Sequence, residues 1–131
     1  MTKSVEYKSL GFLIDELITT QFKQGVVGEN VEIRERIYLL ETTIARRIFK
    51  LDLSDAQYQE MQEYVEMLRR VLRECWDAQE VVRFHAIHSM EEVALAGIAA
   101  QQTNGVRNTL IREIDRVSND TYASPTVKTY A

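Results

Sequence analysis

The feature that most constrains the fold is the position of the only proline, Pro125, which leaves the 124 residues before it without one. Proline costs roughly 3 kcal/mol in a helix interior and commonly ends a helix. Long helices are therefore compatible with nearly the whole chain. Apolar residues also recur at helical spacing, beginning with Leu10, Leu13, Ile14, Leu17, Ile18 and Phe22. The chain is predicted to be all-α.

The apolar spacing divides the chain into four long helices joined by short connections, which favours an antiparallel bundle. Ser54 with Gln57 and Ser89 with Glu92 have the form of capping boxes and mark two of the starts. The turn signal Asn104-Gly105 falls inside the last segment, but the apolar spacing continues in phase across it, so we expect no full break. The expected helices cover about residues 4–24, 31–50, 54–88 and 90–118.

A chain of 131 residues suits one domain that buries its own core without disulfides or metal. We expect residues 1–120 to form this single helical domain. Residues 121–131 contain Ser124 and Pro125 and carry no periodic pattern. They are expected to form a disordered, flexible tail whose deletion costs little stability.

Charge and cysteine content bound the class of protein. The formal net charge of -4 argues against a protein that binds nucleic acid through a general basic field. The single cysteine, Cys75, cannot form an intramolecular disulfide, which fits a reducing compartment. No stretch approaches 18 apolar residues, so we expect no membrane segment and a cytoplasmic location.

The last predicted helix is apolar on two sides. Leu95 and Ile98 mark one side, and Ile111 and Ile114 mark another. Small residues along this helix would let a second helix approach closely: Ala94, Ala96, Gly97, Ala99 and Ala100. A helix with two apolar sides is either central in its own bundle or half buried in a partner, so a homo-oligomer is expected.

A stripe of basic and aromatic residues borders the apolar side of the third predicted helix. It consists of Arg69, Arg73, Trp76, Glu80 and Arg83. Guanidinium groups can hold a phosphate or carboxylate bidentately, and an indole can stack on a base. The alternative is that the charged residues pair along the helix and Trp76 fills a groove between helices. The sequence leaves both interpretations open.

Other residues with chemical potential fit no complete motif. His85 and His88, with Glu91 and Glu92, offer metal-ligand types at helical spacing, but neither HExxH nor Glu-x-x-His is present. Cys75 falls on the apolar side, where a thiol is usually inert. We therefore expect no catalytic residue, no metal site and no cofactor, and keep His85, His88 and Glu92 as the weak metal candidates.

Three segments resemble small all-helical domains of unknown function from bacterial and phage genomes. The segment Ser9–Leu17 is similar to their LG-x-LID-x-L start, Trp76 to Arg83 to their W-x-x-E-[DE]-x-x-R stretch, and Asn104 to Leu110 to their N-x-x-R-x-x-L ending. Gln79 stands where an acid is common. The resemblance implies a shared polar cluster, which would contain Asp15, Trp76, Glu80, Arg83, Asn104 and Arg107. It implies a fold more than a function.

These observations together predict a non-enzymatic helical oligomer of phage type. It would bind a partner or an anionic small molecule, for example by sequestering a nucleotide messenger. The predicted ligand-binding residues are Arg69, Arg73, Trp76, Glu80, Arg83, Asn104 and Arg107. Two alternatives remain, a metal-dependent helical hydrolase and a purely structural or adaptor protein.

Overall fold

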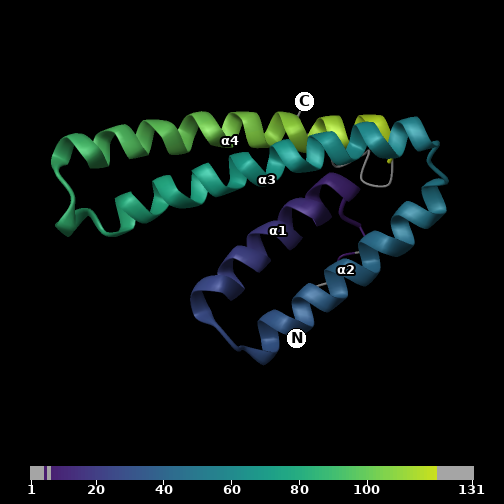
Figure 1. The fold of residues 1–131 in the computed structure, drawn as a ribbon, viewed down its shortest axis with the longest axis horizontal. Helices are drawn as coiled ribbons and strands as arrows, with labels where there is room; N and C mark the ends of the chain where they lie inside the picture. The colour runs from purple at the N-terminus through teal and green to yellow at the C-terminus, as the bar shows by residue number, and fades with distance from the viewer. Residues whose placement is uncertain (1–4, 6, 121–131) are drawn as a thin grey trace.

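The computed structural model describes residue 5 and residues 7–120, and its elements are four long helices and one short helical turn (Figure 1). No strand occurs among the described residues, which confirms the all-α prediction. None of the described helices combines the length and apolarity that spanning a membrane requires. The elements are α1 (Leu10–Val27), α2 (Val31–Leu51), α3 (Asp55–Arg83), the 3₁₀ helix η1 (His85–Ile87) and α4 (Met90–Ser118).

The structure confirms the two helix starts that the capping-box signals predicted. Ser54 and Ser89 each accept a hydrogen bond from the backbone of the residue three positions later, and both capping boxes are complete. The predicted end of the third helix at residue 88 is wrong, because α3 stops at Arg83 and η1 fills the connection to α4. As predicted, α4 runs unbroken through Asn104 and Gly105.

The start of the first helix also differs from the prediction. α1 begins at Leu10, where Ser9 accepts a hydrogen bond from the backbone amide of Phe12. Its end extends to Val27, and Gly28 follows at φ 84, a backbone conformation that glycine adopts without strain. The predicted tail, residues 121–131, lies outside the described residues.

The helices form two antiparallel hairpins, α1–α2 and α3–α4. The main core joins α1 to both helices of the second hairpin and contains Leu10, Ile14, Ile18, Met61, Val65, Leu68, Leu72, Leu110, Ile111, Ile114 and Val117. A smaller core between α1 and α2 contains Val5, Leu13 and Leu40. α1 is thus the central helix, and α2 reaches the second hairpin mainly through it.

The α3–α4 hairpin is much longer than α1, the helix that packs on it. At 1.5 Å per residue, the 29 residues of α3 or α4 span about 44 Å, against about 27 Å for the 18 residues of α1. The hairpin therefore extends well past α1 and α2 (Figure 1). We call this extension, residues 80–103, the arm.

The two apolar sides predicted for the last helix are resolved by this arrangement. Ile111 and Ile114 are buried in the main core, so their side is internal to the chain. The exposed large apolar side chains of α4 are instead Met90, Leu95, Ile98 and Val106, on or next to the arm. The Ile111 side of α4 is therefore not available to a second copy.

Candidate functional site

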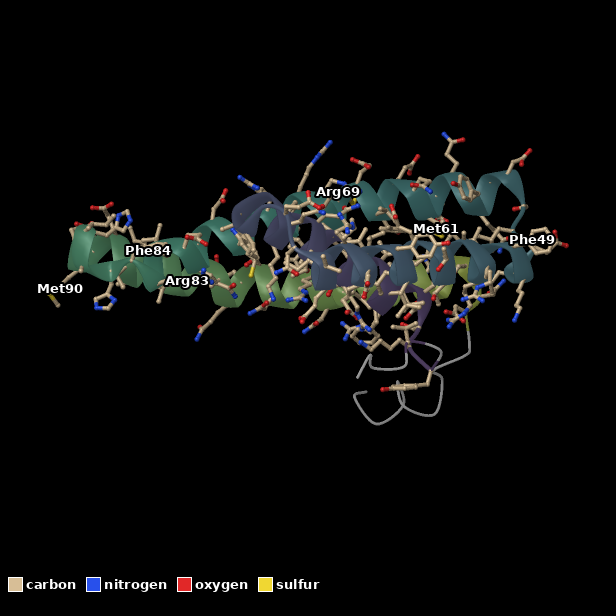
Figure 2. All side chains as sticks on the ribbon, turned by 90° about the horizontal axis from the view of Figure 1, so that it is seen from below. Phe49, Met61, Arg69, Arg83, Phe84 and Met90 are labelled. Carbon is tan, nitrogen blue, oxygen red and sulfur yellow. The ribbon has the colours of Figure 1, made fainter. Side chains whose placement is uncertain are left out.

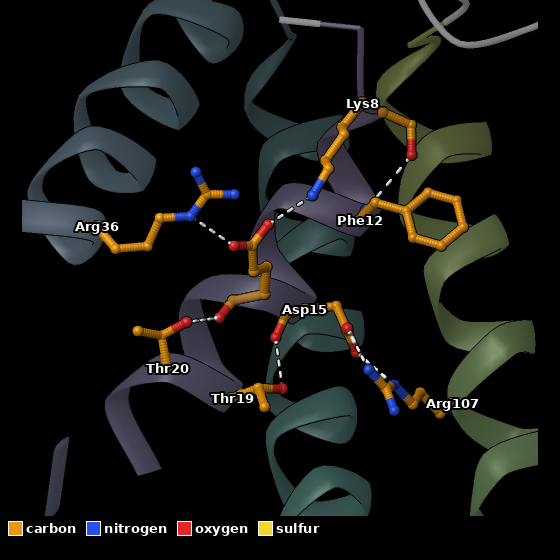
Figure 3. Close-up of polar contacts among 9 residues, drawn as sticks. Lys8, Phe12, Asp15, Thr19, Thr20, Arg36 and Arg107 are labelled. Carbon is orange, nitrogen blue, oxygen red and sulfur yellow. Dashed lines mark hydrogen bonds and ion pairs between the residues drawn. The ribbon is translucent and has the colours of Figure 1, made fainter. Parts of the chain in front are cut away.

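α1 and α4 are joined by a close contact and an ion pair. A Cβ at Gly11 would lie 2.5 Å from the backbone oxygen of Ile111, so only glycine allows the helices to come this near. One turn further on, Arg107 donates to both carboxylate oxygens of Asp15, Nε at 2.7 Å and Nη2 at 2.6 Å (Figure 3). The Asp15 side chain is only 7% exposed. The hydrogen bonds from Arg107 to Asp15 raise the pKa of the guanidinium further.

Carboxylates from the far end of the chain cap the N-terminus of α1. The amide of Leu10 donates to Asp120 Oδ2 at 2.6 Å, and the amide of Gly11 donates to Asp115 Oδ1 at 2.7 Å. Arg47 from α2 donates to Asp120 at 2.9 Å and to the backbone oxygen of Lys8 at 2.9 Å. Free amides and the helix dipole both favour negative charge here. Side chains from α2 and from the end of α4 thus converge on this helix end.

The carboxyl group of Asp115 titrates abnormally. Burial, with a further contribution from the charge of Asp120, raises its pKa to about 6. Hydrogen bonds from the Gly11 amide and Ser9, and the charge of Arg47, act in the opposite direction but do not outweigh burial. Near neutral pH this group therefore carries a partly desolvated negative charge.

A second ion cluster joins α1 to α2. Glu16 accepts hydrogen bonds from Lys8 Nζ at 2.8 Å and from Arg36 Nε at 2.7 Å (Figure 3). Burial acts to raise the pKa of Glu16, but the hydrogen bonds from Arg36 and Lys8 outweigh it and lower the value. The cluster holds the two helices in register and offers no open group to a ligand.

Four of the six residues in the predicted polar cluster gather where α1 crosses α3 and α4. A cavity of about 30 Å³ is lined by Thr19, Phe22, Leu72, Cys75, Trp76, Gln79 and Arg107. Asp15 binds Arg107 at its edge, and Asn104 accepts a 3.7 Å hydrogen bond from the Cys75 thiol. The cavity has room for about one water molecule, whereas small-molecule sites typically measure about 300–1,000 Å³. The cluster therefore closes the junction between helices.

Glu80 and Arg83, the other two members, lie on the arm and pair with each other at 3.2 Å. The rest of the arginine stripe is also paired along α3. Arg69 lies 3.9 Å from Glu66, and Arg73 lies 3.5 Å from Asp77. Such exposed pairs contribute about 0–1 kcal/mol each, so they hold the arginines only weakly. The stripe has no fixed geometry for an anion.

Trp76 contributes to packing. Its ring meets the Phe22 ring edge to face at a centroid separation of 6.2 Å and an angle of 70°. The guanidinium of Arg73 lies 5.5 Å from the centre of the same Phe22 ring. One guanidinium and two aromatic rings thus share a half-exposed surface between α1 and α3.

The weak metal candidates stay apart or pair with each other. His88 Nδ1 lies 3.2 Å from Glu92 Oε2, while His85 is exposed on η1. A hydrogen bond from the Ser89 backbone, followed by the contact with His88, lowers the pKa of Glu92. Within the described ranges, no three His, Cys, Asp or Glu side chains are placed to share a metal ion.

The arm carries an exposed apolar surface, of which the sequence pattern indicated only Leu95 and Ile98. Phe84, Ile87 and Met90 are 51, 80 and 90% exposed where α3 passes through η1 into α4, at the end that we call the tip. Figure 2 shows Phe84 and Met90 there. Leu95 and Ile98 on α4 are 60 and 53% exposed. Periodic apolar residues look the same in sequence whether a helix face is covered or open. The available signal was that residues 93–106 contain no charged side chain.

No family model matches this chain, and no curated protein or solved structure shows significant similarity to it. The chain is a small all-helical domain. Its resemblance to bacterial and phage domains of unknown function rests on the three motifs alone.

Proposed function

We propose that this protein is a non-enzymatic, cytoplasmic binding protein of bacterial or phage type that acts as a homo-oligomer. Its tip docks into an apolar pocket on another protein. The observation that carries this proposal is the exposure of Phe84, Ile87 and Met90 at the end of a hairpin that no other described helix covers. Large apolar side chains that enter a partner's pocket supply most of the free energy in many protein interfaces.

The remaining surface supports docking better than small-molecule chemistry. The cavity beside Trp76 is too small for a substrate, and the arginines of the stripe each pair with a carboxylate on α3. The tip, in contrast, exposes apolar side chains that a monomer gains nothing by presenting to water. An adaptor, the structural alternative from the sequence, is the functional class that matches this surface.

Site-specific photocrosslinking in the cells that naturally contain the protein tests the proposal. A photoreactive phenylalanine analogue at Met90 is expected to crosslink to one defined protein. The same analogue at Phe49, which is 87% exposed at the opposite end of the molecule, serves as the matched control (Figure 2). Ile87→Asp should abolish the Met90 crosslink, because it places a charge in the partner's apolar pocket. Equal crosslinking from both positions would refute docking through the tip.

A second candidate function is the binding of an anionic small molecule such as a nucleotide messenger. The surface shared by Arg73, Phe22 and Trp76 favours it, since it combines a guanidinium with two stacking rings. Nucleotides titrated against the fluorescence of Trp76, the only tryptophan, would report binding. Arg73→Gln should then remove the response while changing the stability by less than about 1 kcal/mol. An unchanged signal across nucleotides and cyclic dinucleotides would leave docking as the function.

A further inference from the structure

The side of α4 that faces away from the core carries a regular seam. Its members are separated alternately by four and three residues, the spacing that keeps a seam aligned along two paired helices. They are Glu91, Leu95, Ile98, Gln102, Gly105, Thr109 and Arg112, and every one of them is exposed. We call this set the outer face of α4.

The outer face is built unlike a solvated helix surface. A helix side that stays in water is usually charged, yet the seam has charges only at its ends, Glu91 at one and Arg112 at the other. Neither side chain forms an ion pair with another described residue. The two ends are therefore available for opposite charges on a partner.

No close contact within the single chain requires a glycine at position 105. A Cβ at this position would meet nothing within 4 Å, and α4 continues as a regular helix through it. Glycine weakens a helix interior relative to alanine, so a glycine here is unfavourable unless another backbone comes close from outside. It lies on the same seam as Leu95 and Ile98, the two large apolar residues.

We propose that the outer face of α4 packs antiparallel against the same face of a second copy, about a twofold axis near Gln101 and Gln102. This pairing brings Glu91 close to Arg112 of the second copy, at both ends of the contact. It also places Ile98 opposite Gly105 of the other chain, where the missing side chain leaves room, and Leu95 beside Thr109. The seam from residue 91 to 112 is about 32 Å long.

Charge decides the direction of pairing. In a parallel arrangement, Glu91 would face Glu91 and Arg112 would face Arg112, and like charges at both ends oppose association. The antiparallel arrangement satisfies both charges with one type of contact. The inference rests on the proposal that the protein is a homo-oligomer, and it names the surface and the orientation.

Sedimentation velocity of the full chain, over a range of concentrations up to about 100 μM, measures the association. The unaltered protein is expected to form dimers, and Ile98→Glu should raise the dimer Kd at least about 100-fold because it buries an unpaired charge in each copy. Phe49→Glu is the matched control, an exposed apolar residue changed to the same charge away from the seam, and should leave the Kd unchanged. Gly105→Leu should also prevent dimers while preserving helix content, since the single chain has space for the new side chain.

Exchanging the end charges tests the orientation. Glu91→Arg and Arg112→Glu should each weaken the dimer, and the chain carrying both changes should regain it, because its new charges again oppose each other in the antiparallel pair. Failure of the double variant to recover would overturn this orientation. Dimers that tolerate Ile98→Glu would overturn the seam but leave the proposed oligomer standing. A monomer at every concentration would overturn both.

Discussion

Gly11→Ala is expected to destabilise the protein, although alanine is the better helix former. The added Cβ would lie 2.5 Å from the backbone oxygen of Ile111 and 3.0 Å from Asp115 Oδ1. A backbone oxygen cannot rotate away as the end of a long side chain can. α1 must therefore move away from α4, and the move stretches the hydrogen bond from the residue 11 amide to Asp115.

The size of the effect follows from three contributions. Overpacking at a tight contact costs about 1–3 kcal/mol. Weakening a hydrogen bond to a charged group costs part of its contribution of about 1.5–3 kcal/mol. Alanine returns up to about 1 kcal/mol through its higher helix propensity. The free energy of unfolding should thus fall by about 2–4 kcal/mol.

Urea denaturation followed by far-ultraviolet circular dichroism measures this loss. Gly97→Ala is the matched control, because it makes the same chemical change in a helix where the new Cβ meets nothing within 4 Å. It should raise the free energy of unfolding by about 0.5–1 kcal/mol. If Gly11→Ala proves as stable as the unaltered protein, the close contact between α1 and α4 is not as we describe it.

Three further predictions concern the same junction. Arg107→Leu leaves the Asp15 carboxylate buried without its partner and should cost about 3–5 kcal/mol in a urea titration, with much of the loss recovered when Asp15→Leu is added. The pKa of Asp115 is raised, so the folded state binds a proton on this carboxyl group more tightly than the unfolded state does. The stability that protonation of Asp115 contributes is complete below about pH 4 and is lost as the pH rises through about 6. As the pH rises through this range, the urea midpoint should fall less for Asp115→Asn than for the unaltered protein. Equal pH profiles would contradict the raised pKa of Asp115. Ile111→Asp puts a charge in the core, so circular dichroism should show unfolding, and folded monomers would contradict the burial.

Local rules predicted the helices well because they act within a few residues. The capping boxes at Ser54 and Ser89 are complete within four residues each, and both starts were placed correctly. The predicted start of the first helix at residue 4 is wrong. Ser9 caps α1 locally, but the amides of Leu10 and Gly11 are bound by Asp120 and Asp115, which lie more than 100 residues away in the sequence. Spacing of apolar residues marks a helix face but not the residue where the helix begins.

At the candidate site too, the sequence indicated which residues lie together but not which partners they bind. The motif resemblance brought together Asp15, Trp76, Asn104 and Arg107, and the structure places all four at one junction. It did not indicate that the charges satisfy one another and leave no open site. Whether Arg107 meets a ligand or Asp15 depends on how α1 crosses α4, which no local pattern encodes.

The residues that stabilise the fold and the surface proposed for association therefore lie on different parts of this chain. Gly11, Asp15 and Arg107 hold α1 against α4, and their partners lie on the side of α4 that faces the core. Leu95 and Ile98 lie on the exposed side of α4 and belong to neither core cluster. Substitutions at the junction should lower the free energy of unfolding without changing the dimer Kd measured well below the unfolding transition. Substitutions at the outer face should raise the dimer Kd without changing the free energy of unfolding. A variant at either site that changed both properties equally would show that the arm depends on α1 for its shape.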